Sequence, residues 1–595
     1  MEMLKKMLNE IILGEFGVDF DASIILEKEK FGDYSTNAAM ILAGKLHKNP
    51  REIALAIIAK MPSEVAAEIA GAGFINFTLP AALVFREVSE KWNEKYGENN
   101  SGNGKKAIVE YPSQNMAKPY SVGHLRPGTQ GAAAANILRA NGWEIITDNH
   151  LGDYGTPFGI WVVGFLRLSD DARLAEGGVY ELGRIYIEMK KILKDASNFS
   201  FSEKEKLPKE KIEDKNSPDA TVRIFDNKSL AEEVQDWLLK LEKGDAEAVE
   251  YSRRFKEISL AHIHEVMRRL GLATDLELGE AFFAPMGKEL VEKYVDLGVF
   301  VKNEDGSVVC TLDEFGIETP ILLQKSNGAA LYATNDLATL VYREENFAPD
   351  KVVYAVGAEQ KFYFEQLFAM AHKLGIETDL VHLWFGTIDQ MTDGKREKMS
   401  SRKGVVLMEE LLDEAEARAR AMIRSAEDAS DGVSSKNVSD EDIRRIATGA
   451  IKFADFVADR KMGILFDWET IFALTGFSAA YVQYAGVRMK RILSSLEDFE
   501  MADFGAYDFE AEKSLLKLLA EYPLLVARVG ENLEMHKLSH FAYDLAVAVN
   551  KYYEKTPILK ASSAEKSARV LVLRWTLQVL THCLGLIGVE IPERM

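Results

Sequence analysis

Hydrophobic and polar positions change their spacing several times along the chain. Ile11, Ile12 and Phe16 recur at helical spacing, and the apolar positions of 38–46 resume that period after a polar turn. Residues 73–79 instead alternate apolar and polar side chains, as a half-buried strand does. The first part of the chain is therefore predicted to be a small α+β unit.

The next segments have the pattern of a parallel sheet. Residues 107–111 predict a strand, 123–141 a helix ended by a glycine, and 143–148 a second strand. Strand, helix and strand at this spacing predict a βαβ unit. Similar strands recur at 351–357 and 381–385. We therefore predict an α/β domain with a parallel sheet, which is interrupted by a helical insertion and then completed.

Polar stretches mark the boundaries between these units. Residues 98–106 carry two glycines and predict a linker, and 427–439 separate the second half of the core from a region with almost only helical patterning. The charged run 203–215, in a mainly helical stretch, is interpreted as a solvated face or loop. The predicted units are residues 1–100, 101–165, 166–275, 276–425 and 440–595.

Composition narrows the class of protein. The chain has 595 residues, of which 47% are apolar and 28% charged, as in ordinary globular proteins. A net charge of −21 argues against a wholly basic nucleic-acid coat but leaves room for a local RNA-binding patch. The two cysteines, Cys310 and Cys583, are far apart, which argues against a disulfide framework and a cysteine zinc site. With no long apolar run, a cytoplasmic multidomain protein without a membrane partner is expected.

The loop between the first core strand and its helix is the first candidate for chemistry. In open parallel sheets, ligands bind beyond the carboxyl ends of strands, where helix N-termini meet phosphates. In this Gly-His loop (residues 113–124), Lys118 and His124 could donate to phosphate oxygens, and Gly123 would let a flat base approach the backbone. Simple helix capping is the alternative interpretation.

A second candidate is the basic loop at residues 395–404. It carries five cations, and glycines lie at its edges, so it could close on a polyphosphate as charge develops on the leaving pyrophosphate. A solvated basic loop is the alternative.

Together these loops resemble the two ATP signatures of class I aminoacyl-tRNA synthetases, usually written HIGH and KMSKS. More narrowly, an ordered set of segments resembles the arginyl-tRNA synthetase family and spans nearly the whole chain. These segments are residues 32–37, 73–77, 110–126, 149–155, 331–336, 360, 481–485 and 592–595. The resemblance implies, in chain order, an N-terminal tRNA-elbow-binding α+β domain, a split α/β Rossmann-like catalytic domain of HUP type with a helical insertion, and an all-α anticodon-binding bundle.

The implied activity is that of an arginine–tRNA ligase. L-arginine would react with ATP, supplied as its Mg2+ complex, to give arginyl-adenylate, and the arginyl group would pass to the 2′-OH of the terminal adenosine of tRNA(Arg). Positioning and charge stabilisation do most of the work in such chemistry. A monomer without a structural metal is expected.

The resemblance also implies roles for individual residues in the two loops. The residues implied to contact phosphates during catalysis are Lys118, Ser121, His124 and Lys398. The residues implied to bind ATP are Gly123, His124, Lys398, Met399, Ser400 and Arg402.

The expected arginine site combines carboxylates with polar side chains. Planar carboxylates suit the guanidinium fork because the pairing is bidentate and charge-assisted. By resemblance, Glu110 and Asp336, helped by Tyr332, would hold the guanidinium, and Asn115 and Gln360 would hold the backbone end. Asp336 alone could equally be a helix N-cap, and Tyr332 and Gln360 could be packing or surface residues.

The expected tRNA contacts lie at the two ends of the chain. Phe74 and Asn76 would touch the tRNA elbow by analogy. Aromatic and arginine side chains suit unstacked anticodon bases. The implied anticodon contacts are Tyr481, Tyr484, Arg488 and Met595, although Tyr481 and Tyr484 could instead be core residues of the bundle.

Four positions depart from the family pattern. Ser121 stands where the first histidine of the HIGH motif is usual, and Pro127, Pro157 and Ser401 also differ. Two alternatives stay open. Ser121 suggests a catalytically weakened or silent tRNA-binding paralogue. A cysteinyl-type class I synthetase is disfavoured by the lack of zinc-ligating cysteines and by the paired carboxylates.

Overall fold

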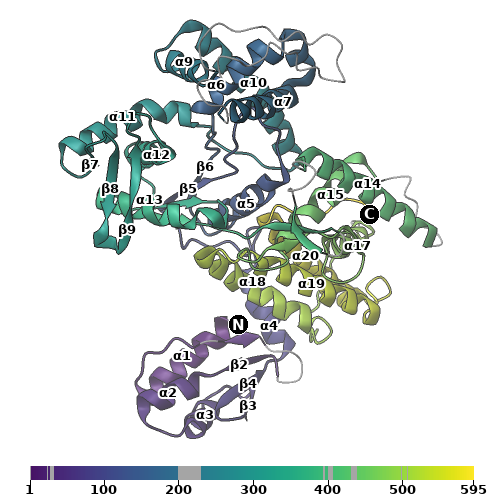
Figure 1. Cartoon of the computed structure of the whole chain (residues 1–595). Helices are drawn as coiled ribbons and strands as arrows, with labels where there is room; N and C mark the ends of the chain where they lie inside the picture. Colours follow the sequence, from purple (N-terminus) through teal and green to yellow (C-terminus); the bar gives the residue numbers. More distant parts are fainter. Residues whose placement is uncertain are drawn as a thin grey trace.

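A computed structural model describes residues 2–22, 24–26, 32–197, 230–392, 395–399, 406–429, 438–496, 499–505 and 507–595. Figure 1 shows the α+β unit of the N-terminus at the bottom, a helical insertion at the top and the parallel sheet between them. The predicted fold class is confirmed: a parallel-sheet core lies between an N-terminal α+β unit and a C-terminal helical bundle. Within the described residues, no helix is both long and apolar enough to cross a membrane.

The N-terminal unit packs helices on an antiparallel sheet of order β1-β2-β4-β3. Leu4, Leu8 and Ile12 recur every fourth residue of its first helix and are all buried, so one apolar stripe faces the core. The elements are α1 (Glu2–Phe16), β1 (Ile25–Leu26), β2 (Tyr34–Thr36), α2 (Ala38–Leu46), α3 (Pro50–Ala59), β3 (Ala66–Ala70), β4 (Phe74–Thr78) and α4 (Ala81–Lys91).

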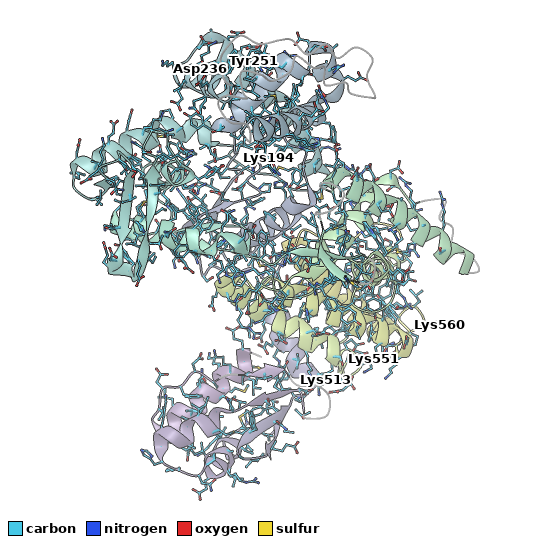
Figure 2. All side chains as sticks on the ribbon, in the orientation of Figure 1. Lys194, Asp236, Tyr251, Lys513, Lys551 and Lys560 are labelled. Atoms are coloured by element: carbon cyan, nitrogen blue, oxygen red, sulfur yellow. The ribbon has the colours of Figure 1, made fainter. Side chains whose placement is uncertain are left out.

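The N-terminal unit is tied to the far end of the chain. Asp33 accepts from Lys517 Nζ at 3.1 Å and pairs with Lys513 Nζ at 3.0 Å. Figure 2 labels Lys513 at the side of the bundle that faces the N-terminal unit. Nearby, the ring of Phe85 on α4 stacks on Phe509 with 3.8 Å between centroids. Polar and apolar contacts therefore both fasten the N-terminal unit to the bundle.

The core sheet has the order β11-β10-β5-β6, and its strands are parallel. Its strands are β5 (Lys106–Glu110), β6 (Glu144–Asp148), β10 (Lys351–Tyr354) and β11 (Asp379–His382), and its helices include α5 (Leu125–Ala140), α12 (Tyr332–Phe347) and α13 (Lys361–Lys373). The predicted βαβ unit is β5-α5-β6. Its helix begins with a 3-10 turn at Val122–His124, and Gly142 has φ +84 just after its end. Pro127, third in α5, is tolerated because the first N–H groups of a helix have no intrahelical acceptor.

Two insertions separate the halves of this sheet. The first is helical and comprises α6 (Thr156–Leu168), α7 (Asp171–Ser197), α9 (Leu230–Glu242) and α10 (Ala246–Arg269). The charged run 203–215 lies outside the described residues. The second was not predicted: α11 (Glu280–Asp296) is followed by an antiparallel sheet of β7 (Val301–Lys302), β8 (Val308–Leu312) and β9 (Ile317–Gln324). Cys310, Leu312 and Leu323 belong to a separate apolar core shared with α12 and α13.

The rest of the chain forms a hairpin and the helical bundle. A three-stranded sheet joins β12 (Ile388–Thr392), β13 (Lys395–Lys398) and β14 (Ile464–Leu465). The helices are α14 (Met408–Ala429), α15 (Asp440–Asp455), α16 (Trp468–Ile471), α17 (Ala479–Ser494), α18 (Lys513–Asn532), α19 (His536–Lys555) and α20 (Ser563–Leu586).

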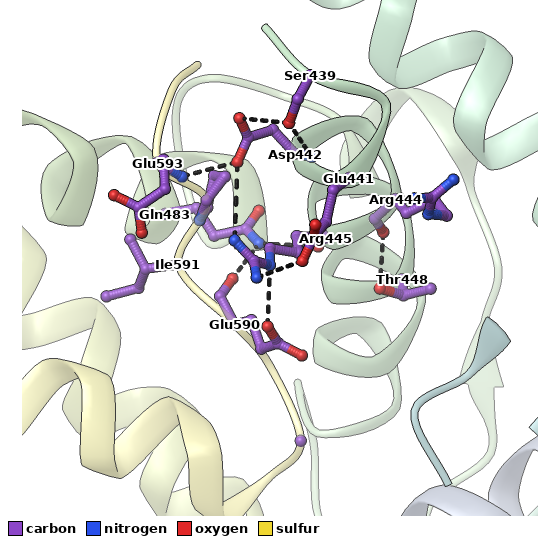
Figure 3. A network of polar contacts seen from close by, with 12 residues as sticks. Ser439, Glu441, Asp442, Arg444, Arg445, Thr448, Gln483, Glu590, Ile591 and Glu593 are labelled. Atoms are coloured by element: carbon purple, nitrogen blue, oxygen red, sulfur yellow. Dashed lines mark hydrogen bonds and ion pairs between the residues drawn. The ribbon is translucent and has the colours of Figure 1, made fainter. Parts of the chain in front are cut away.

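The last residues of the chain lie against α15 and α17 (Figure 3). Arg445 Nε lies 3.0 Å from Glu590 Oε2, and the backbone N–H of Glu593 donates to Asp442 Oδ1 at 2.8 Å. Gln483 Nε2 donates to the carbonyl of Glu590 at 2.7 Å. This network fixes the chain end to the bundle.

Candidate active site

The Gly-His loop lies beside the segment that directly follows the basic loop. The backbone N–H of Val122 donates to the carbonyl of Val406 at 3.0 Å, and that of Met408 donates to the carbonyl of Tyr120 at 2.9 Å. The Gly-His loop is thus paired with the segment that directly follows the basic loop. This proximity is what a site made from both loops requires.

The basic loop itself is described only in part. Its strand β13 pairs antiparallel with β12, and the buried Met399 donates its backbone N–H to the carbonyl of Ile388 at 2.8 Å. Lys398 is the last residue of β13. Ser400 and Arg402, which were predicted to bind ATP, lie outside the described residues.

His124 is held by Ser121, the residue that departs from the family pattern. The Ser121 backbone N–H donates to His124 Nδ1 at 3.3 Å, and the Ser121 hydroxyl lies 3.2 Å from the same nitrogen. Burial, together with the charge of Lys118, lowers the pKa of His124 to about 4, so the ring is neutral near pH 7. Because Nδ1 accepts, the proton of the neutral ring resides on Nε2, which can donate to a phosphate oxygen.

The other predicted residues of this loop are accessible. Lys118 is exposed, and its Nζ lies 5.3 Å from the centroid of the Tyr186 ring on α7, so the helical insertion helps to place this cation. Asn115 and Gly123 are also exposed. A ligand can therefore approach the backbone at Gly123.

A carboxylate cluster lies at the carboxyl ends of β5 and β6. It comprises Glu110, Asp148, Asp153, Glu280 and Asp336. Electrostatic coupling links Glu280 to Asp336 and Asp153, and Asp336 to Glu110. Arg343 Nη2 lies 2.7 Å from both Glu110 and Asp148, so Glu110 already binds a guanidinium that belongs to the chain.

Asp336 lies inside α12, in its second turn, and Leu331 precedes the helix, so the N-cap interpretation of Asp336 was wrong. The Tyr363 hydroxyl donates to its carboxylate. Burial raises the pKa of Asp336, and the charge of Glu110 adds to this effect. Tyr332, the first residue of α12, is 68% exposed, and Gln360 is exposed just before α13.

Glu280 was missed by the sequence reasoning. Burial raises its pKa to about 8, and the charges of Asp336 and Asp153 contribute. An acid in the first turn of a helix is an ordinary feature of sequences, so only its clustering with other carboxylates distinguishes it. Lys256 Nζ lies 2.8 Å from Asp153 Oδ2 and forms an ion pair with it. Within the described residues, neither Glu280 nor Asp336 has an ion-pair partner. The cluster thus has an excess of acid.

One set of side chains has the spacing of a metal site. Single ligand atoms of Glu110, Asp148 and His150 all lie within 4.8 Å of one another. Arg343 already binds both carboxylates. We therefore interpret Glu110 and Asp148 as an ion triad with Arg343 rather than as metal ligands.

The residues predicted to contact tRNA differ in accessibility. Phe74 is 37% exposed, whereas Asn76 is only 6% exposed, so a direct tRNA contact of the Asn76 side chain is not supported by its placement. In the bundle, Tyr484 is 42% exposed, so it is not a core residue. Tyr481 is half-buried against the ring of Tyr543, with 5.4 Å between centroids, which favours the packing interpretation.

Two further predicted tRNA contacts are engaged with the bundle. The guanidinium of Arg488 lies 4.7 Å from the centroid of the Tyr553 ring. Met595 packs partly against the core, and its oxygen accepts from Arg491 Nη2 at 3.0 Å.

Three family models match the chain in succession. They are described as the arginyl tRNA synthetase N terminal domain (residues 2–79), tRNA synthetases class I (R), catalytic domain (88–468), and the DALR anticodon binding domain (482–595). A curated relative from Streptococcus pneumoniae (strain CGSP14), named arginine–tRNA ligase, is 32% identical over 568 residues, covering 94% of this chain and 93% of the relative.

Solved structures agree in fold. The arginyl-tRNA synthetase of Thermus thermophilus has a TM-score of 0.77 at 23% identity and covers 100% of both chains. That of Plasmodium falciparum has a TM-score of 0.77 at 20% identity, covering 100% of this chain and 99% of its own. From the matched models and the identity to the curated relative, the chain belongs to the arginyl-tRNA synthetase family of class I aminoacyl-tRNA synthetases.

Proposed function

We propose that the chain is an arginine–tRNA ligase whose substrates are L-arginine, ATP and tRNA(Arg), and that it works as a monomer. The observation that carries the proposal is the excess of acid in the carboxylate cluster at the end of β5, the strand that leads into the Gly-His loop. Burial is the main cause of the raised pKa values of Asp336 and Glu280, and within the described residues neither carboxyl has an ion-pair partner. A guanidinium and an α-ammonium group would supply positive charge there.

In the proposed arginine site, Asp336 and Tyr332 take the guanidinium, with Glu110 at the end of β5. Asn115 and Gln360 contact the amino-acid backbone from the two strand-to-helix loops. The side-chain exposure of Asn115, Tyr332 and Gln360 supports these roles, because each is accessible to a ligand. Glu280 adds a further carboxylate near Tyr332, whose pKa is raised by burial and by Glu280.

The reaction needs little acid–base chemistry. The arginine carboxylate attacks the α-phosphorus of ATP, and the bond to the pyrophosphate oxygen breaks. The terminal ribose hydroxyl of tRNA then attacks the carbonyl carbon of arginyl-adenylate, and AMP leaves. We propose that His124 Nε2–H, Lys118 and Lys398 stabilise the charge that develops on the phosphates. ATP would enter as its Mg2+ complex.

Arginine-dependent ATP–pyrophosphate exchange, with tRNA(Arg) added, tests the proposal. We expect exchange with arginine and background rates with cysteine. Asp336→Asn should raise the KM for arginine, since a neutral amide cannot pair with a guanidinium. Asp296→Asn is the matched control, because Asp296 is exposed at the end of α11. Folded protein without arginine-dependent exchange would refute the proposal.

A silent paralogue remains a second candidate because of Ser121. Ser121→His tests it separately. If the native site is competent, this substitution should change the exchange rate little, because the Ser121 backbone already fixes the ring of His124. A large gain in exchange would instead identify an impaired native site.

A further inference from the structure

The register of the core sheet aligns the last residues of three neighbouring strands. Glu110 of β5 is paired with Asp148 of β6 on one side and with Tyr354 of β10 on the other. Side chains of residues paired across a sheet project to the same face. Two carboxylates and one aromatic ring thus form a row across the carboxyl edge of the sheet.

Arg343 lies over this row. Its Nη2 donates to Glu110 Oε2 and to Asp148 Oδ2, each at 2.7 Å, and its guanidinium carbon lies 5.6 Å from the centroid of the Tyr354 ring. The side chains of Arg343, Glu110 and Asp148 are 3%, 9% and 2% exposed. The guanidinium that the two buried carboxylates share offsets the repulsion between them.

Helix α12, which carries Arg343, also carries Asp336, the carboxylate proposed to bind the substrate guanidinium. Asp336 and Arg343 are seven residues apart on α12, which is about two helical turns, so both lie on one face of the helix. The second oxygen of Glu110, Oε1, accepts from the Ser113 hydroxyl at 3.3 Å. Glu110 is therefore held at both oxygens, and its position relative to Asp336 is set by α12.

We propose that Arg343 is a positioning residue of the arginine site: it neutralises Asp148 and orients Glu110, so that the excess negative charge is left for the substrate cation. This inference rests on the proposed function. Arg343 does not contact the substrate. It acts through Glu110, and its loss leaves two buried carboxylates without the cation that they share, so the side chain of Glu110 is no longer held at Oε2.

Charge-balance variants test this role. Arg343→Gln should raise the KM for arginine roughly tenfold to a hundredfold, as misplaced binding groups do, and leave the KM for ATP nearly unchanged. Arg343→Lys keeps the charge and should recover part of the loss. Arg343→Gln combined with Asp148→Asn removes the second acid as well and should bring the KM for arginine back toward the wild-type value.

Arg269 offers a matched control. Its Nη2 also bridges two carboxylates, Asp413 at 2.7 Å and Glu416 at 2.9 Å, on a different part of the chain. Arg269→Gln should leave the KM for arginine unchanged, which separates a local role of Arg343 from general loss of an ion pair.

Three results would overturn the inference: an unchanged KM for arginine in Arg343→Gln, an equal rise of the KM for ATP, or no recovery in the double variant. If the Arg343→Gln variant does not fold, the KM values of the Arg343→Lys variant test the inference instead. A rise in the KM for arginine alone, smaller than about tenfold, would then support the role, and an unchanged KM for arginine or an equal rise in both KM values would overturn it. Wild-type protein without exchange would refute the proposed function itself, whereas normal wild-type exchange with unaffected variants refutes only the inference.

Discussion

The buried carboxyl of Glu280 predicts that arginine binding releases a proton. The pKa of Glu280 is raised to about 8 by burial and by the charges of Asp336 and Asp153. At pH 7 about nine in ten of these carboxyls are therefore protonated. A substrate cation that binds beside Glu280 favours the ionised form and lowers this pKa again.

The expected magnitude follows from linkage. If the pKa falls well below 6 in the complex, binding releases about 0.9 proton at pH 7 and about 0.1 at pH 9. The affinity for arginine then rises about 15-fold between pH 6.5 and 8. The substrate guanidinium keeps its charge over this range, because its pKa lies above about 12.

Calorimetric titration of the protein with arginine measures this release directly. The observed heat is compared at one pH in buffers that differ in ionisation enthalpy. Glu280→Gln should abolish the release and flatten the pH dependence of affinity. Glu289→Gln, an exposed position of the same helix, should preserve both. No release at pH 7, or equal release by wild type and Glu280→Gln, would refute this reasoning.

Glu280 also predicts how stability depends on pH. Its pKa is higher in the folded protein than the ordinary value of 4.5, so the folded state binds more protons between pH 4.5 and about 8. Its contribution to the free energy of unfolding therefore falls as pH rises through that window. Above pH 8, Glu280→Gln should unfold at higher temperature than the wild type, whereas at pH 4.5 the two should be alike.

Three further predictions concern α5 and its start. Arg126→Met should destabilise the fold by about 3–5 kcal/mol, because it leaves the buried Asp455 without its ion-pair partner at 2.7 Å; urea unfolding measures this loss. Gly131→Ala should lower the melting temperature, since a Cβ there collides with the side chain of Tyr111, whereas Gly14→Ala, with open space around it, should not. The exchange rate should show no ionisation of His124 between pH 6 and 8, because its pKa is about 4; a pH–rate profile that breaks near 6.5 and loses this break in His124→Asn would contradict the neutral ring.

Much of the fold could be predicted because its elements have strong local patterns. The strands β5, β6, β10 and β11 are short, largely apolar runs that end in residues with a polar group, as buried parallel strands can. The sheet β7-β8-β9 was missed because two of its strands are brief or partly exposed. Their core forms only against α12 and α13, which local periodicity cannot show.

The candidate site could be predicted where motifs are contiguous. The two loops are recognisable from sequence, and the structure places the Gly-His loop beside the segment that follows the basic loop. Glu280 and Arg343 could not be recognised, because their roles arise from the register of β5 with β6 and from the face of α12 that lies over the sheet. Asn76 fits a motif but is buried, since alternation along a strand does not say which face a neighbouring helix covers.

The contact of Asp33 with Lys517 has a consequence for the order of events during synthesis. The two residues are 484 positions apart. At the usual elongation rate, roughly 25 to 100 seconds pass between their appearance on the ribosome. The N-terminal unit has its own helices and sheet and can fold early, but its docking surface waits for the last hundred residues of the chain. A ribosome that stalls in that interval would hold a folded N-terminal unit without the lysine partners of Asp33, and a chaperone or a protease could reach the uncovered docking surface.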